Sequence, residues 1–368
     1  MEKISYSIKT LFQKIKSFFT STEFLKKYDK FRKIMKKVIP AIVVYGLLIC
    51  FCYVFVYPIL RVFVDSLKTE ADVSNPDIAW IPTSIYWKNY SRASDNLKLF
   101  LVYKDGNVFA GFKSTFLNSI LYASINAVLQ TFVAGLAGYS FARFKFPGKK
   151  FWFAGLIISF VIPSQILVMP RQMIMKDLVV FFSDPAKNIF HITNAQSQQM
   201  FYSFFSVFST VPIMIISILG QGINSAILIF IFYGFFKMIP QDLDEAAQID
   251  GANYAQIFYH VILKMSVSTI LVVFLFSFVW NWNDTFTLST LLFAEGVDTK
   301  YAFETLPEAL GIFRYFKSQG GLGQEEYADA PNLRGAGIII SILPLAILYA
   351  VAQRKFVEGI ENTGVTGV

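Results

Sequence analysis

Six long stretches without any Asp, Glu, Lys or Arg are the feature that most constrains this chain. They cover residues 38–60, 114–142, 151–170, 211–236, 265–283 and 335–353. A helix of about 20 apolar residues crosses the hydrocarbon core of a bilayer. Only helices and closed barrels satisfy their backbone polar groups there, and the stretches lack the alternating pattern of barrel strands. The sequence therefore predicts an all-α membrane protein with six transmembrane helices.

The composition agrees with the lipid bilayer as the main solvent. Hydrophobic residues make up 55% of the chain and charged residues only 16%, against about 25% charged residues in a soluble domain. The net charge of +8 would suggest a nucleic-acid partner in a soluble protein. Here the charges lie between the apolar stretches, so we expect membrane lipid and no nucleic acid as a partner.

Lysine and arginine indicate the orientation of the chain, because cytoplasmic loops carry an excess of them. If the N-terminus is cytoplasmic, the inside segments are 1–37, 143–150, 237–264 and 354–368. These segments hold more than half of the 33 lysines and arginines but only about a third of the 25 acidic residues. We therefore predict a multi-pass membrane protein with both termini in the cytoplasm.

The predicted organisation follows from these boundaries. Residues 1–37 form a cytoplasmic basic amphipathic tail, 38–60 the first transmembrane helix, and 61–113 an extracytoplasmic loop. Residues 114–353 form a core of five transmembrane helices, and 354–368 a cytoplasmic tail. The basic tail is interpreted either as a helix on the anionic inner leaflet or as an unordered segment that only sets the topology.

The sequence offers no catalytic, cofactor-binding or metal-binding motif. His191 and His260 are the only histidines, and Cys50 and Cys52 lie within one apolar stretch. No Ser-His-Asp set, HExxH motif or phosphate-binding P-loop is readable. The spans also lack the ionisable group that proton- and ion-coupled carriers place at mid-membrane. We expect no enzyme, no metal and no cofactor in this chain, so energy for transport would come from elsewhere.

The loop over residues 237–264 carries the most information. Pro240 can open a helix, and Asp242, Asp244 and Glu245 follow in its first turns, where the helix dipole favours negative charge. Gly251 is a natural break before a second apolar-periodic segment. The loop is therefore predicted as helix, glycine hinge and helix. It could dock against a partner, or could be an ordinary amphipathic loop on the membrane surface.

Part of this loop, "EAAQIDGANYAQIF", resembles the EAA motif of binding-protein-dependent ABC importer permeases. Glu245, Ala246, Ala247 and Gly251 match the motif at its spacing, and Asp250 fits the carbohydrate-uptake branch.

Further segments are similar to the same branch, in order along residues 112–368. They are "FLNSILYA" at 116–123, "GYSFARFKFPGKKFW" at 138–152 and "VWNWNDTF" at 279–286. The C-terminal "AQRKFVEGIENTGVTG" resembles the smaller membrane subunit of maltose-transporter type. One departure is Lys264, which stands where the family usually has proline.

The resemblance implies a type I ABC importer permease fold in the plasma membrane of a bacterium, and a role as permease in ATP-driven import of sugars, with oligosaccharides expected. It implies half of a translocation pathway, shared with a second homologous permease subunit. The other implied partners are two ATP-binding subunits, which would bind the ATP, and an extracytoplasmic sugar-binding protein. The ATPase-coupling residues would be Glu245, Ala246, Ala247, Asp250 and Gly251.

The outer end of the fifth predicted span offers candidate pathway residues. They are Trp280, Asn281, Trp282, Asn283 and Asp284. Aromatic faces and hydrogen-bonding groups suit sugars, but tryptophans at a span end also serve as interface anchors. Two other functions stay open: an ABC permease for a peptide, amino acid or anion, and a stand-alone channel or secondary carrier.

Overall fold

The structure is a computed structural model that describes residues 22–97, 99, 114–194, 197–198, 206–292, 303–311 and 331–364. These residues are mainly helical, and no strand occurs among them. The chain divides into two units, Met1–Phe63 and Val64–Val368.

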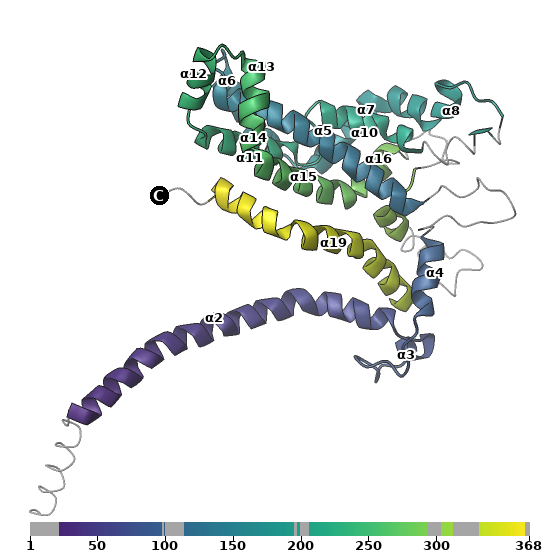
Figure 1. The fold of residues 1–368 in the computed structure, drawn as a ribbon. Coiled ribbons are helices and arrows are strands. Elements are labelled where there is room, and N and C mark those ends of the chain that lie inside the picture. Colours follow the sequence, from purple (N-terminus) through teal and green to yellow (C-terminus); the bar gives the residue numbers. More distant parts are fainter. Residues whose placement is uncertain are drawn as a thin grey trace, which may run out of the picture. The chain divides into compact units, whose positions relative to one another are not determined.

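The first unit is dominated by helix α2 (Thr22–Ser66), which runs on into the start of the second unit (Figure 1). Its segment Arg32–Ser66 is long and apolar enough to cross a membrane, and includes the span predicted at 38–60. The apolar side chains of this segment are exposed, as expected for a helix that lies in lipid. The helix continues across the predicted boundary at residue 37, while residues 1–21 of the predicted tail lie outside the described residues.

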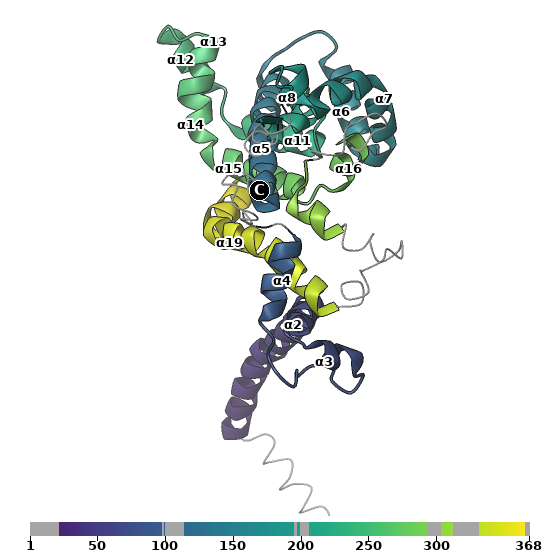
Figure 2. The same cartoon turned by 90° about the vertical axis from the view of Figure 1, so that its right-hand side faces the viewer.

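The second unit is a helix bundle built around α5 (Thr115–Arg143), which packs against α11 (Ser225–Met238) and α15 (Val267–Trp282) (Figures 1 and 2). Helix α19 (Pro331–Gly364) packs against α15 and against α4 (Lys88–Asn96). The remaining described elements are α3 (Glu70–Ser74), α6 (Lys149–Val161), α7 (Ser164–Ser183), α8 (Pro185–Asn188), η1 (Ser206–Thr210), α10 (Val211–Ile218), α12 (Asp242–Ile249), α13 (Tyr254–Ile257), η2 (Phe258–Ile262), α14 (Leu263–Met265) and α16 (Phe286–Leu292).

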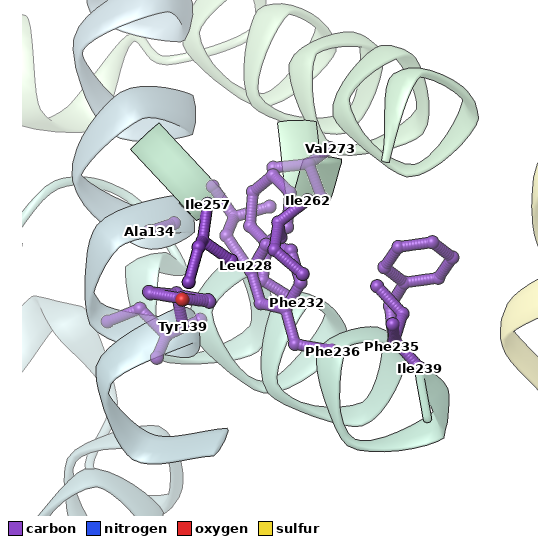
Figure 3. Packing of buried hydrophobic residues seen from close by; sticks show 11 residues of the cluster. Ala134, Tyr139, Leu228, Phe232, Phe235, Phe236, Ile239, Ile257, Ile262 and Val273 are labelled. Atoms are coloured by element: carbon purple, nitrogen blue, oxygen red, sulfur yellow. The ribbon is translucent and has the colours of Figure 1, made fainter. Parts of the chain in front are cut away.

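Helices α5 and α11 approach closely because small residues face the contact. A Cβ on Gly138 would lie 2.6 Å from the Cβ of Phe232, so no larger residue fits without a shift. Small residues at helix interfaces let backbones pack closely in membranes, where the hydrophobic effect between helices is weak. The core cluster at this contact includes Ala134, Phe232 and Phe236 (Figure 3).

The all-α prediction is confirmed, whereas the count of six spans stays a prediction. Three described helices are long and apolar enough to cross a membrane, and up to five spans result if each bent helix pair counts as one. The predicted span 151–170 is divided between α6 and α7 at Ile162 and Pro163, because proline disfavours helical backbone in the residue before it. The predicted span 211–236 is divided between α10 and α11, where Gly220 and Asn224 have positive φ.

Candidate functional site

The 237–264 loop folds as two helical segments that separate at Gly251, as its sequence predicts. Helix α12 is bent by 71° from α11. At its end the N–H of Gly251 donates to the carbonyl of Gln248 (3.0 Å), and the N–H of Ala252 donates to the carbonyl of Ala247 (2.9 Å). These bonds form a Schellman motif, in which the residue after the C-cap takes left-handed backbone. Gly251 has φ +86°, which explains glycine at this position.

The second segment of the loop starts with a capping box. The Asn253 side chain accepts from the N–H of Gln256 (2.9 Å), and the Gln256 side chain accepts from the N–H of Asn253 (2.8 Å). The helix then runs through α13, the π-helix η2 and α14, and is bent by 78° from α15. Ile257 and Ile262 are fully buried, so they fix this segment to the core.

The free side of α12 offers a surface that could dock a partner. Glu245, Ala246, Asp250 and Gly251 are exposed, while Ala247 is half-buried against the core cluster. Large apolar side chains exposed on the loop include those of Leu243, Ile249, Tyr254 and Tyr259, with Ile249 87% exposed. The carboxylate of Glu245 lies in the first turn of α12, where the helix dipole stabilises it.

An aromatic cluster connects this loop to α5. The ring of Tyr139 lies 4.8 Å from that of Phe258, and 5.6 Å from those of Phe236 and Phe144. Phe144 in turn lies 5.7 Å from Tyr254 on α13. Figure 3 shows Tyr139 beside the residues contributed by α11 and the loop. The loop is thus attached to the helices of the bundle through packed rings.

The two candidate tryptophans of the pathway lie in different surroundings. Trp282 is 2% exposed and packs against Phe116 and Phe278, with ring centroids 6.3 and 5.9 Å away. Trp280 is half-buried and stacks on Phe276 at 5.5 Å. Trp282 is therefore a core residue of this chain.

The polar candidates differ as well. Asn283 is exposed, and its amide donates to the carbonyl of Val279 (2.9 Å). Asp284 is buried, and accepts from the hydroxyl of Tyr122 (3.2 Å) and from the N–H of Thr287 (2.9 Å). Burial raises the pKa of Asp284 above its usual value, while the hydrogen bond from Thr287 opposes this.

Asn281 belongs to a group of buried polar side chains that we call the polar seam. Its members are Asn126, Gln130, Ser217, Ser277 and Asn281. The Ser217 hydroxyl donates to Asn126 (2.7 Å), and the Ser277 hydroxyl donates to Gln130 (2.6 Å). The Asn281 amide donates to the carbonyl of Ser277 (2.8 Å). Among the residues that the structure describes, the Gln130 amide nitrogen and the Asn281 side-chain oxygen have no hydrogen-bond partner.

The polar seam borders a cavity of about 690 Å³ between α5, α6, α7, α10, α11 and α15. Gln130, Ser217 and Asn281 lie in its wall, together with the rings of Trp152 and Phe160. A cavity of this size, largely apolar with a few convergent polar groups, has the form of a small-molecule site. The wall thus combines apolar surface with a few amide and hydroxyl side chains.

Of the polar seam, the sequence alone singled out Asn281 but not the other members, although α5 carries a signal for Asn126 and Gln130. Its buried face repeats polar or small residues at helical spacing, as at Ser119, Asn126 and Gln130. The sequence also gave no reason to pair Arg143 with Asp244, which approach within 3.3 Å in the structure. Their separation along the chain leaves no local pattern to recognise.

Comparison with protein families gives one match over most of the chain. A sequence model of the family described as "Binding-protein-dependent transport system inner membrane component" matches residues 130–362. This range includes the 237–264 loop and most of the polar seam.

Similar proteins cover nearly the whole chain. A probable ABC transporter permease protein of Pyrococcus horikoshii is 26% identical over 89% of this chain and 97% of its own length. The probable starch degradation products transport system permease protein AmyC of Thermoanaerobacterium thermosulfurigenes is 27% identical over 83% and 90%. The trehalose transport system permease protein SugB of Mycobacterium tuberculosis is 26% identical over 84% and 92%.

A solved structure has the same fold. It is a chain of a bacterial ABC transporter involved in the import of the acidic polysaccharide alginate. The TM-score is 0.59 at 21% sequence identity, over 87% of this chain and 98% of that chain.

Proposed function

Because the chain belongs to the family of binding-protein-dependent transport system inner membrane components, and is therefore a permease of an ABC importer, we propose that its cargo is a sugar. Oligosaccharides are the proposed class. The observation that carries this proposal is that two relatives, aligned over 83% and 84% of the chain, are named for starch degradation products and trehalose.

The chemistry of the cavity supports a sugar. Its wall combines aromatic rings with hydroxyl and amide groups, and two buried polar atoms of the polar seam lack partners. Sugars present both C–H faces for rings and hydroxyl groups that donate and accept. We propose that this chain contributes half of the translocation pathway, and that a second homologous permease subunit contributes the other half.

The 237–264 loop is proposed as the contact to the ATP-binding subunits. Its exposed helix α12 with Glu245, Ala246, Ala247, Asp250 and Gly251 would dock on one of two such subunits, which bind and hydrolyse the ATP. An extracytoplasmic sugar-binding protein would deliver the cargo. This arrangement places the loop and both termini in the cytoplasm of a bacterial cell, with the chain itself in the plasma membrane.

Reconstitution tests this function. The full complex, with the binding protein and ATP supplied, would be incorporated into vesicles, and uptake of radiolabelled trehalose, maltotriose and an alginate trisaccharide measured. We expect ATP-dependent uptake of at least one sugar. Uptake restricted to peptides, amino acids or anions that are not saccharides would contradict the sugar assignment. Uptake by the chain alone without ATP would indicate a secondary carrier.

The contribution of the cavity is tested by Gln130→Leu and Asn281→Leu in the same complex. Each removes an unpartnered polar atom of the polar seam, together with the partnered atom of the same amide, Gln130 Oε1 or Asn281 Nδ2. We expect the KM for the transported sugar to rise about tenfold, because a lost hydrogen bond of this kind contributes about 1–1.5 kcal/mol. An unchanged KM in both variants would mean that the polar seam only joins the helices.

A further inference from the structure

The ends of three helices meet around one side chain, Arg143. Arg143 is the last residue of α5, and its Nη2 donates to the carbonyl of Ile239 at the end of α11 (2.9 Å). Its Nε lies 3.3 Å from Oδ2 of Asp244, in the first turn of α12. The side chains of Arg143 and Asp244 are only 6% and 15% exposed.

The electrostatics of this junction agree with the helix dipoles. A cation near the C-terminal ends of α5 and α11, and a carboxylate in the first turn of α12, are each stabilised by the partial charges of those helix ends. The planar guanidinium of arginine can contact the carbonyl and the carboxylate together, which the single ammonium of lysine does less well. Arg143 is thus suited to hold α12 against both helices.

The contact between Arg143 and Asp244 is incompletely hydrogen-bonded, so another arrangement of the helices could strengthen it. Arg143 Nε and Asp244 Oδ1 have no hydrogen-bond partner within the described part of the chain, although both atoms are buried. The pair is therefore held by charge and proximity rather than by two aligned hydrogen bonds. Because a buried, incompletely hydrogen-bonded ion pair is weak evidence for stability, a role in positioning explains its presence better than a role in holding the fold.

The same helix leads from this junction to the cavity. Helix α5 is continuous from Thr115 to Arg143, and carries Asn126 and Gln130 of the polar seam. Gln130 lies about 20 Å from Arg143 along the axis, at a rise of 1.5 Å per residue. A continuous helix transmits a displacement at one end to the other.

We propose that Arg143 is a positioning residue that, through Asp244, fixes α12 to α5, so that movement of the 237–264 loop displaces the cavity wall. The inference rests on the proposed function, because it requires ATP-binding subunits that move the loop. Arg143 does not itself touch the cargo or the ATP-binding subunits in this role. Removal of the Arg143 side chain would uncouple ATP hydrolysis from sugar uptake.

The test measures sugar molecules imported per ATP hydrolysed, in vesicles that contain the whole complex. The variants are Arg143→Ala, Asp244→Asn and Arg143→Lys, and the cargo is whichever of trehalose, maltotriose and alginate trisaccharide the unaltered complex imports. Lys145→Ala serves as the control, because Lys145 is an exposed cation two residues from Arg143. We expect the ratio to fall about tenfold for Arg143→Ala and Asp244→Asn, less for Arg143→Lys, and not for Lys145→Ala.

A purely structural role would give a different result. The amount of assembled complex would then fall, while the ratio of sugar to ATP in the remaining complex would equal that of the unaltered complex, and this would overturn the proposal. If Arg143→Ala does not assemble, an unchanged ratio in both Arg143→Lys and Asp244→Asn would overturn it equally. Absence of any ATP-driven sugar uptake by the unaltered complex would instead refute the proposed function.

Discussion

Replacing Gly251 tests the 237–264 loop most directly. Its φ of +86° is accessible to glycine but costs other residues about 1–2 kcal/mol. No atom lies within 4 Å of a Cβ built at this position, so within this chain the cost is backbone strain without a clash. A cost of that size reduces the population of the native turn roughly 5- to 30-fold relative to competing conformations of the loop.

The expected order of sugar uptake follows from this cost. Asparagine tolerates left-handed backbone, alanine does so less well, and β-branched valine least. The loss of uptake should therefore be smallest for Gly251→Asn, larger for Gly251→Ala and largest for Gly251→Val. The amount of protein in the membrane should stay close to normal, because the spans pack independently of the loop. The assay is ATP-dependent uptake in vesicles, with complex recovery and ATP hydrolysis measured in parallel.

A matched control is Gly234→Ala in α11. Gly234 also has open space around its Cβ but lies within a helix, where alanine is favoured by about 1 kcal/mol over glycine. Its uptake should be unchanged. Normal uptake by Gly251→Val would refute the reasoning that the turn must be left-handed for function. An equal loss in all three variants would show that a partner backbone approaches Gly251 too closely for any side chain.

Three other predictions follow from the described residues. Glu245→Lys places a cation in the first turn of α12, and should leave membrane levels normal while abolishing uptake, as measured in the same vesicles. Trp282→Ala should reduce the free energy of unfolding by about 3–5 kcal/mol and lower the amount of folded protein, whereas half-buried Trp280→Ala should do so less; thermal melting compares them. Burial raises the pKa of Glu308 to about 7, so the native chain keeps this proton to higher pH than the unfolded chain. Stability should then fall as the pH rises from about 4.5 to about 7, by about 3 kcal/mol at most, and Glu308→Gln should remove this part of the pH dependence in melting curves.

The local features of the loop could be predicted from sequence because each depends on neighbouring residues. The acidic first turn of α12 and the break at Gly251 follow from dipoles and from the conformational freedom of glycine. The division of the span at Pro163 was also readable in principle, because proline constrains the residue before it. When charged residues alone set the limits of a predicted span, a break inside an uncharged apolar stretch is not detected.

The surroundings of Trp282 and Arg143 depend on contacts between distant segments. A tryptophan at the end of a span is suited both to the membrane interface and to a core, and only the packing of Phe116 from another helix decides between them. Likewise, Arg143 has the sequence context of a positive cytoplasmic loop, which gives its orientation in the membrane. Its contact with Asp244 arises because α5, α11 and α12 end at one place.

The absence of charge from the predicted spans and the presence of the polar seam have one physical explanation. An ionised group within the bilayer costs far more than an amide or hydroxyl, which needs only one or two hydrogen bonds to become tolerable. Ser277 and Gln130 meet part of this need within the chain. The remaining donor on Gln130 and acceptor on Asn281 lie in side chains that border the cavity. Amide and hydroxyl side chains that hydrogen-bond to one another therefore let a membrane helix bundle hold polar groups in its interior without burying a charge.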